Sequence, residues 1–365
     1  MQAQTFPKRL AKLALCAGLI ASFGAMSAQA EEYYAGKTVT LLVGFSPGGG
    51  TDQFARVVAD HLDDHIPGNP SVIVQNMPGS GSVLASNHYV TRVEPNGETL
   101  MVGTGQLLMR ILLGLRGSQA ELTQYDPLMA GPAGRVTFAS PELGIETPQD
   151  IQAKAGDMIH ASAGIMASID TLLGLKVLDT EIRAITGYKG KAETLLAFER
   201  GEANVDGQTM PNYIDKVQPM IEEGKAVPLF SQGFIDDAGR LVADPAVPDL
   251  PTVADVYRSL NDGQDPSGPA WDAYMAMTGA TVSLGRVLMV HEDAPDEAVA
   301  ALEAGVRSML QDATFQKEIE ASLNGYVPYD GPALEAAVNA VRGMSPETRT
   351  WLKEFLTRAY GARFE

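Results

Sequence analysis

Strand-like runs that end in glycine-rich turns recur along this chain, and this repeat constrains the fold more than any other feature. Residues 38–45 are too continuously apolar for a strand with one wet face, which indicates a strand buried on both sides of a parallel sheet. They end in the turn at 46–52, and apolar residues at helical spacing follow at 53–65. A second strand-like run at 71–75 leads into a second glycine turn at 76–82. Repetition of strand, glycine turn and helix predicts an α/β fold.

A second set of such units begins near residue 135 and predicts a second lobe. Strand-like residues occupy 135–139, 158–161 and 182–185, and the last two runs lead into turns at 162–164 and 186–190. We therefore predict two lobes, each with a mostly parallel sheet flanked by helices. Residues 31–130 would form the first part of lobe 1, 131–245 would form lobe 2, and 246–365 would return to lobe 1 with the C-terminal helices.

Other segments give weaker patterns. The sequence predicts a strand at 99–102 before Gly103, Thr104 and Gly105, a helix that starts at 147–150, a helix at 192–200, an irregular connection at 236–269, a strand at 285–290, and helices at 296–324 and 332–360. The Met and Leu residues of 107–115 are expected to be core residues.

The first thirty residues have the order of a secretory signal peptide. Basic Lys8, Arg9 and Lys12 precede an apolar stretch and the small-residue triplet at 28–30, which predicts cleavage after Ala30 and export to the periplasm. The apolar stretch is shorter than the roughly 20 residues that span a bilayer, so we expect a removable leader and no membrane-spanning segment. The only cysteine lies in this leader, and the mature chain therefore has no disulfide and no cysteine metal site.

The chain is acidic, with a formal net charge of −18 at pH 7, and loss of the leader would make it more negative still. Nucleic-acid partners are disfavoured, because phosphate binding depends on a field of Lys and Arg side chains. An anionic ligand would also be repelled by the protein as a whole. We therefore expect any such ligand to be held by local dipoles.

The glycine turn at 46–52 is suited to binding an anion. Three consecutive glycines allow backbone amides to approach a ligand, and the start of a helix favours negative charge. The alternative is that Thr51 or Asp52 simply caps the following helix. Turns at 76–82, 103–105 and 162–164 also follow strands, and ligands of open α/β sheets gather at the carboxyl ends of strands. Together these turns indicate a cleft for a small carboxylate.

Other chemistries match the sequence poorly. The glycine turns lack the Lys-Ser/Thr ending of a phosphate-binding loop and the spaced third glycine of the dinucleotide pattern, and no serine lies in a nucleophile elbow. His61 and His65 are four residues apart, but beside Asp63 and Asp64 they indicate a solvated helix face and not a metal site. We therefore predict no catalytic residue, no metal and no cofactor.

Several polar residues could line the cleft, and each also has a structural interpretation. Tyr188 could pack with its hydroxyl holding a turn, and Asp170 could begin a helix. The polar candidates are Thr104, Gln106, Asp170, Tyr188, Asp206, Gln208 and Thr209.

The turns resemble those of the receptors of tripartite tricarboxylate transporters, the Bug family. The likeness rests on residues 45–52 with Ala55 and Arg56, and on 74–81. It continues at 161–164, 188–190, 201–204, 250–252 and 312–315. The resemblance implies a Venus-flytrap receptor whose two lobes close on a small carboxylate and present it to a membrane permease. A monomer suffices for such closure.

In such receptors backbone groups and ordered waters of the first two turns hold the ligand carboxylate, and the second lobe adds further contacts. The implied ligand-binding residues are Phe45, Ser46, Gly48, Gly49, Gly50, Thr51, Asp52, Pro78, Gly79, Ser80, Gly81, Ser82, Thr104, Ser162, Ala163, Gly164, Met166, Asp170, Tyr188 and Gln208. Departures from the family pattern include Ser82 in place of a glycine, and Met166 and Asp170 in place of glycine and histidine. Met166 could narrow the cleft or offer an apolar wall, which would suit a more hydrophobic acid.

Two other functions remain open at this point. The chain could be a periplasmic enzyme acting on a small organic acid, which would require a catalytic base with an orienting partner. It could also present its ligand to a membrane kinase as a sensor. Gene neighbourhood would separate a sensor from a transport receptor.

Overall fold

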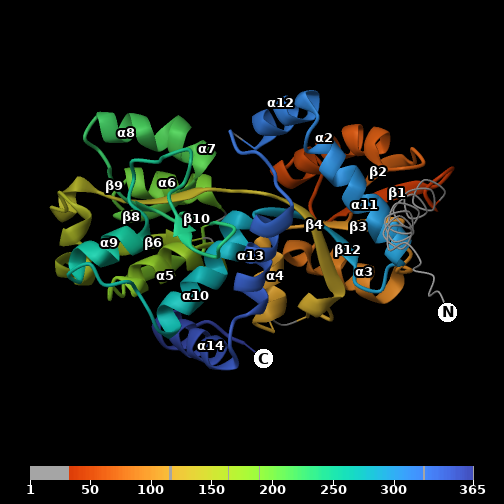
Figure 1. Ribbon diagram of the computed structural model, residues 1–365. Coiled ribbons are helices and arrows are strands. Elements are labelled where there is room, and N and C mark those ends of the chain that lie inside the picture. The colour runs from red at the N-terminus through yellow and green to blue at the C-terminus, as the bar shows by residue number, and fades with distance from the viewer. Residues whose placement is uncertain (1–32, 115–116, 163, 189, 324, 365) are drawn as a thin grey trace, which may run out of the picture.

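The computed structural model describes residues 33–114, 117–162, 164–188, 190–323 and 325–364. The predicted signal peptide therefore lies outside the described residues. Two lobes stand side by side, each built on a five-stranded sheet with helices on its faces (Figure 1). This confirms the predicted two-lobed α/β architecture.

The first sheet has the strand order β2-β1-β3-β12-β4. Its strands are β1 (Thr38–Val43), β2 (Ser71–Asn76), β3 (Thr99–Gly103), β4 (Tyr125–Gly131) and β12 (Arg286–His291). β1 pairs in parallel with β2 and β3, whereas β12 is antiparallel to both β3 and β4. Four strands therefore run in one direction, and β12 alone is reversed.

The second sheet repeats this arrangement with the order β7-β6-β8-β5-β9. Its strands are β5 (Arg135–Ala139), β6 (Ile159–Ser162), β7 (Arg183–Thr186), β8 (Val205–Thr209) and β9 (Val227–Ser231). β6 is parallel to β7 and β8, and β5 is antiparallel to β8 and β9. Here β5 is the reversed strand, so each sheet is mostly parallel in direction with one reversed strand.

Five helices belong to the first sheet: α2 (Gly50–His65), α3 (Val83–Arg92), α4 (Gly105–Leu112), α11 (Asp296–Met309) and α12 (Ala313–Ser322). α2 packs on β1 and β2 through its apolar side, with Phe54, Val58 and Leu62 fully buried. α11 and α12 cover α2 and bury Leu302 and Phe315 in the same core. The first unit of the chain thus folds as its apolar spacing predicts.

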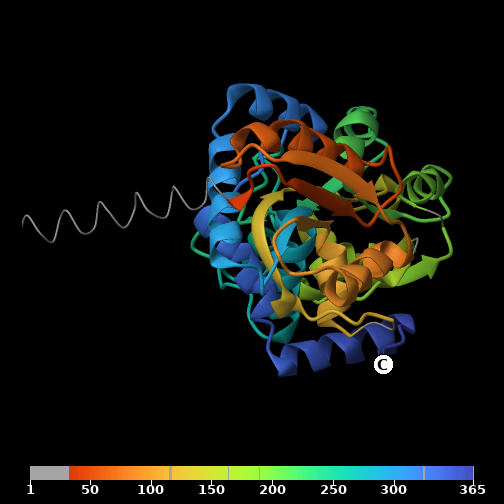
Figure 2. The same cartoon turned by 90° about the vertical axis from the view of Figure 1, so that its right-hand side faces the viewer.

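The second sheet carries α5 (Ile169–Val177), α6 (Lys191–Glu199), α7 (Met210–Asn212), α8 (Gln218–Glu222), α9 (Val253–Leu260) and α10 (Pro269–Thr278). α13 (Gly331–Arg342) and α14 (Pro346–Tyr360) complete the chain, and the blue C-terminal helix lies along the bottom of the molecule (Figure 2). α10 packs against both α5 and α14, and α13 packs against α4. One apolar core therefore continues from the first lobe into the second.

Short turns complete the inventory. These are the 3₁₀ helices η1 (Ser80–Ser82), η2 (Leu122–Gln124), η3 (Pro141–Leu143), η4 (Pro148–Asp150), η5 (Gln152–Asp157) and η6 (Ile165–Ala167), the π-helical η7 (Tyr213–Val217) and η8 (Gly279–Ser283), and the hairpin β10 (Phe234–Ile235) with β11 (Leu241–Val242). Among the described residues no helix is long and apolar enough to cross a membrane.

Four sequence predictions of local structure need correction. The helix expected to start at 147–150 is two short 3₁₀ turns, η4 and η5. The connection at 236–269, which was expected to be irregular, contains α9 and part of the hairpin. The helical region at 296–324 is divided because the Asp312 carboxylate accepts the amides of Thr314 and Phe315 and so starts a new helix. The region at 332–360 is divided in the same way, where Ser345 caps α14.

Two segments cross between the lobes side by side. Residues 132–134 join β4 to β5, and the segment after η8 leads back into β12. The amide of Ala133 donates to the carbonyl of Val282 at 2.9 Å, and a Cβ added at Gly285 would meet the Cβ of Ala133 at 2.5 Å. Since α9 and α10 still pack on α5, we propose that the chain returns to the first lobe at 279–285.

Candidate ligand-binding site

The predicted turns gather at one edge of each sheet. β1, β2 and β3 end at the same edge of the first sheet, where β4 also ends and the reversed β12 begins. In the second sheet β6, β7 and β8 end where the reversed β5 begins. Each crossing segment leaves or enters a sheet at this edge. The turns of the two lobes therefore lie on either side of the junction.

The first turn is organised by Asp52. Its side chain is only 1% exposed and accepts hydrogen bonds from the Gly48 amide at 2.7 Å, from Asn76 Nδ2 at 2.8 Å and from Arg56 Nε at 3.0 Å. Burial alone would raise the pKa of this carboxyl, but the bonds from Arg56, Gly48 and Asn76 outweigh it and lower the pKa to about 2. Asp52 thus shapes the turn through its own hydrogen bonds.

The rest of the first turn faces outward. Ser46, Gly48, Gly49 and Gly50 are exposed, and Gly49 is the N-cap residue of α2. The first amides of a helix have no partner within the helix, so they remain available to an anion. Phe45 is half-buried, and its carbonyl accepts from Asn76 Nδ2 at 2.9 Å. The backbone of this turn can therefore bind a carboxylate without any basic side chain.

The second turn has an unusual backbone. Gly79, Ser80, Gly81 and Ser82 all have positive φ, with Ser82 at 74°. Left-handed conformations favour glycine, so Ser82 holds a backbone conformation that residues with a side chain rarely adopt. Ser82 is fully buried, and its hydroxyl donates to the Gly44 carbonyl at 3.3 Å. The second turn is thereby held against the first, while Pro78, Ser80 and Gly81 stay at least partly exposed.

The second-lobe turn is closed by serine hydroxyls. Ser162 Oγ donates to the Gly164 carbonyl at 2.7 Å and lies 2.8 Å from Ser168 Oγ. Both serines are buried, whereas Gly164 and Met166 are half-exposed. Ala163, which the sequence predicted at this site, lies outside the described residues.

A cavity of about 150 Å³ opens where the lobes meet. It is lined by Gln106, Arg135, Ala167, Ser168, Gly190, Lys191, Thr194 and Thr209. Gln106 belongs to α4 of the first lobe, and the other residues belong to strand ends, turns and the first part of α6 in the second lobe. Larger hollows, of about 530, 740 and 560 Å³, are open grooves that none of the predicted turns lines.

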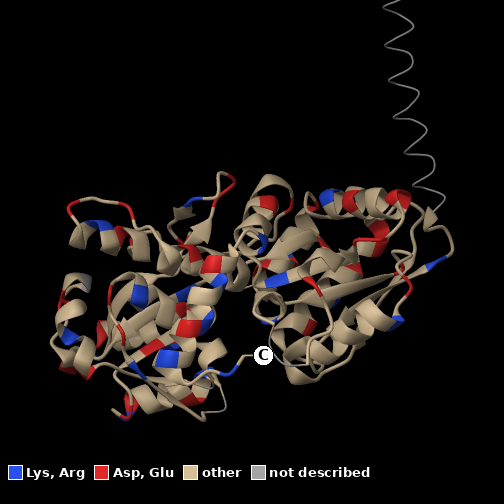
Figure 3. Cartoon of the chain, turned by 90° about the horizontal axis from the view of Figure 1, so that it is seen from below, with Lys and Arg blue, Asp and Glu red and all other residues tan. Residues whose placement is uncertain are grey.

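Arg135, Arg286 and Lys191 stand at this junction, and the sequence prediction included none of them. Arg135 Nε lies 3.3 Å from Asp170 Oδ2, and the Arg135 side chain is 12% exposed. Arg286 Nε donates to the Gly50 carbonyl at 3.3 Å, and the ammonium of Lys191 donates to the Gly207 carbonyl. Burial lowers the pKa of Lys191 and of Arg286, and the charge of Arg135 lowers both further. The Asp and Glu positions, red in Figure 3, are instead spread over both lobes.

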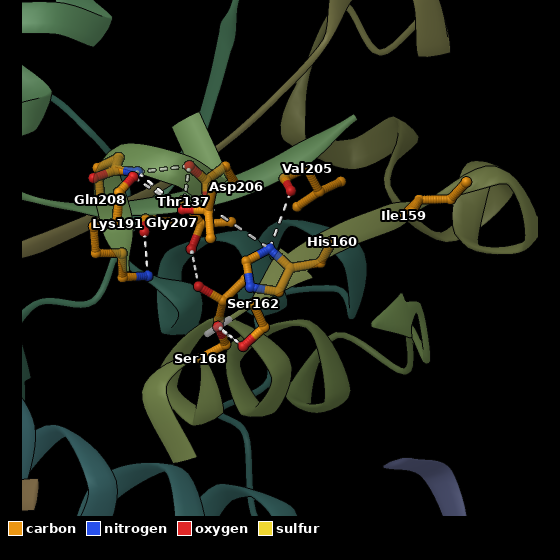
Figure 4. A network of polar contacts seen from close by, with 12 residues as sticks. Thr137, Ile159, His160, Ser162, Ser168, Lys191, Val205, Asp206, Gly207 and Gln208 are labelled. Carbon is orange, nitrogen blue, oxygen red and sulfur yellow. Dashed lines mark hydrogen bonds and ion pairs between the residues drawn. The ribbon is translucent and has the colours of Figure 1, made fainter. Parts of the chain in front are cut away.

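A polar network supports the second-lobe wall from behind (Figure 4). Gln208 Nε2 donates to the Lys191 carbonyl at 2.9 Å and to Asp206 Oδ2 at 2.6 Å. Burial raises the pKa of Asp206 and lowers that of His160 to about 4, while His160 Nδ1 lies 3.0 Å from the Val205 carbonyl. Gln208 is fully buried, so it acts on the start of α6 and not on the cavity directly.

The remaining predicted residues lie in varied surroundings. Tyr188 donates its hydroxyl to Glu202 Oε2 at 3.1 Å and packs on a small cluster of alanines, which matches its structural interpretation. Thr104 is half-buried at the start of α4, and Thr51 is half-buried in α2. His61 lies 3.1 Å from Glu318, and no group of three metal-ligand side chains occurs in the described part of the chain.

Comparisons with known proteins agree with this architecture. No family model matches the chain. The chain is 26% identical to BugT of Bordetella pertussis over 214 residues, which is 56% of this chain and 65% of BugT, slightly under two thirds of that relative. It is 27% identical to a UPF0065 protein of the same organism over 311 residues, 82% of this chain and 83% of that protein.

Three solved structures have the same fold. A TctC solute binding protein from Polaromonas has a TM-score of 0.65 at 16% identity, over 89% of this chain and 99% of that chain. R. palustris Rpa4515, solved with adipate, has a TM-score of 0.57 at 20% identity, over 89% and 97%. Periplasmic binding protein BugD has a TM-score of 0.56 at 18% identity, over 88% and 98%.

The chain thus has the two-lobed α/β fold of solved periplasmic binding proteins. The predicted resemblance to the Bug receptors is confirmed, since the chain is a homologue of the Bug and UPF0065 proteins.

Proposed function

We propose that this protein is a periplasmic receptor that captures a small organic carboxylate between its lobes and delivers it to a membrane permease of the tripartite type. One observation carries the proposal. The exposed amides of the first turn and the cations Arg135, Lys191 and Arg286 meet at the lobe junction of an acidic protein. Such local positive potential attracts an anion that the protein as a whole repels.

The relatives support the ligand class. Rpa4515, which shares this fold, was solved with adipate, a dicarboxylate. Binding energy would drive closure of the lobes about the two crossing segments, because only the closed form brings both sets of turns onto one ligand. The role proposed for the chain is binding and not catalysis.

Substitution of Gly49 tests the site. Gly49 has φ of −82°, and a Cβ there would meet only the Ser46 carbonyl, at 3.8 Å, so Gly49→Val is expected to fold normally. Its side chain would cover the amides at the start of α2. We expect carboxylate affinity to fall on the order of tenfold or more, as for loss of charge-assisted hydrogen bonds.

Gly156→Val is the matched control, because Gly156 is exposed, has no neighbour within 4 Å of an added Cβ and lies far along the chain from the turns. Calorimetric titration with a panel of mono-, di- and tricarboxylates gives the affinities. Equal affinities of Gly49→Val and the control would mean that the first turn is structural only. Uptake of the bound acid by cells with and without the gene separates transport from sensing.

A further inference from the structure

The two reversed strands begin with arginine at equivalent places. β12 is the reversed strand of the first sheet, and its first residue, Arg286, pairs with Gly131 at the end of β4. β5 is the reversed strand of the second sheet, and its first residue, Arg135, pairs with Thr209 at the end of β8. A reversed strand begins at the edge where its neighbours end. Each arginine therefore stands among the turns of its own lobe.

Each arginine also contacts the helix that follows the first turn of its lobe. Arg286 donates to the carbonyl of Gly50, the first residue of α2. Arg135 lies 3.3 Å from the carboxylate of Asp170, the second residue of α5. A glycine-bearing turn, a helix start and an arginine thus recur in both lobes, and we call each such set a half-site.

The charges of the half-sites are not balanced within the protein. Asp170 offsets Arg135, but among the described residues no carboxylate pairs with Arg286. Lys191 adds a further cation on the second-lobe side, where Ser168 and Thr194 share its cavity. The charge of Arg135 disfavours the charged form of Arg286, so the like charges of the two lobes repel across the junction. An anion that reaches both lobes would remove this repulsion.

We propose that Arg135 and Arg286 are specificity-determining residues, each holding one acidic group of a ligand that carries two. The first group would lie between the first turn and Arg286, and the second would lie at Arg135 and Lys191. Guanidinium groups suit this role, because they bind carboxylates through two parallel hydrogen bonds. This inference rests on the proposed function and names its substrate class, a short dianion that bridges the lobes.

Calorimetric titration of the purified protein with matched acids tests the inference. The probes are the linear dicarboxylates from succinate to suberate and the monocarboxylates of equal carbon number. The wild type should bind at least one dicarboxylate ~30-fold or more tightly than its monocarboxylate partner, as expected for an added enclosed charge pair. Arg286→Gln should remove this preference by weakening dicarboxylate binding at least tenfold.

A second variant guards against misfolding. Arg135→Gln alone would leave Asp170 without its cation, so it is combined with Asp170→Asn, which removes both charges together. Arg286→Lys should restore part of the preference, because the charge is kept and the paired hydrogen bonds are lost. Arg200→Gln is the control, since that side chain is 67% exposed at the end of α6.

The outcomes separate the two proposals. Equal affinities of the wild type for both acid classes, unchanged by Arg286→Gln and by the double variant, would overturn the inference and leave the carboxylate receptor standing. Absence of binding to every acid of the panel would overturn both. A dicarboxylate preference that both variants abolish and the control retains is the result expected.

Discussion

Asp52 gives the sharpest test of how the binding turn is built, because one buried carboxylate holds three separate parts of it. Its oxygens accept from the Gly48 amide, from Asn76 on the second strand and from Arg56 on the next turn of α2. Arg56 is half exposed, so that pair contributes only about 0–1 kcal/mol. The two enclosed bonds to Gly48 and Asn76 contribute about 1.5–3 kcal/mol each, as hydrogen bonds to a charged group.

Asp52→Asn keeps the size of the side chain and replaces one acceptor oxygen by an amide that faces donors. We therefore expect the free energy of unfolding to fall by about 2–4 kcal/mol at pH 7, and carboxylate affinity to fall with it because the turn loosens. Denaturation by urea and calorimetric titration measure the two effects. Asp60→Asn, an exposed change on the same helix, is the control.

The pH dependence follows from the lowered pKa of Asp52. The folded value of about 2 is below the ordinary value of 3.8, so the stabilisation is complete above about pH 5 and is lost as the pH falls toward 2. Wild type and Asp52→Asn should converge in stability over that interval. Equal stability of the two proteins at pH 7, or a constant difference down to pH 2, would refute this account of the turn.

Two further predictions concern the junction and the buried network. Gly105→Ala should lower the unfolding midpoint by several degrees or prevent folding, because the added Cβ would sit 1.3 Å from the Ala280 carbonyl oxygen. Thermal unfolding measures this effect, with Gly156→Ala as the control. Equal midpoints of the two variants would contradict the prediction. His160 is buried, and burial lowers its pKa to about 4. As the pH falls from 6.5 to 4, the unfolded chain therefore takes up a proton at this residue before the folded protein does, and the free energy of unfolding decreases. His160→Gln should reduce that loss by up to about 3 kcal/mol, and parallel stability curves of wild type and variant would speak against it.

The early part of the fold could be predicted well because its signals are local. β1, α2 and β2 begin or end within a few residues of the predicted bounds, since continuous apolar runs and glycine turns mark them clearly. β8 was missed because its sequence, Val-Asp-Gly-Gln-Thr, is polar, and only the structure shows that its Asp206 and Gln208 are buried by α6. The splitting of the C-terminal helices depends on capping residues within an otherwise helical pattern.

The sequence predicted the backbone turns of the candidate site but none of its basic side chains. The turns at 46–52 and 78–82 do lie together, because they follow adjacent parallel strands. Arg135 and Arg286 begin strands that the sequence did locate, but a pattern gives no strand direction. In a fully parallel sheet both residues would lie at the edge opposite the turns, and only the reversal of β5 and β12 brings them to the site.

Solution X-ray scattering with and without ligand tests the central claim most directly, namely that an acidic two-lobed protein closes on a small carboxylate. We predict that a saturating dicarboxylate reduces the radius of gyration of the wild type, and that Gly49→Val shows no reduction at the same concentration. An unchanged radius of gyration across the whole acid panel, with no rise in the unfolding midpoint, would contradict the claim.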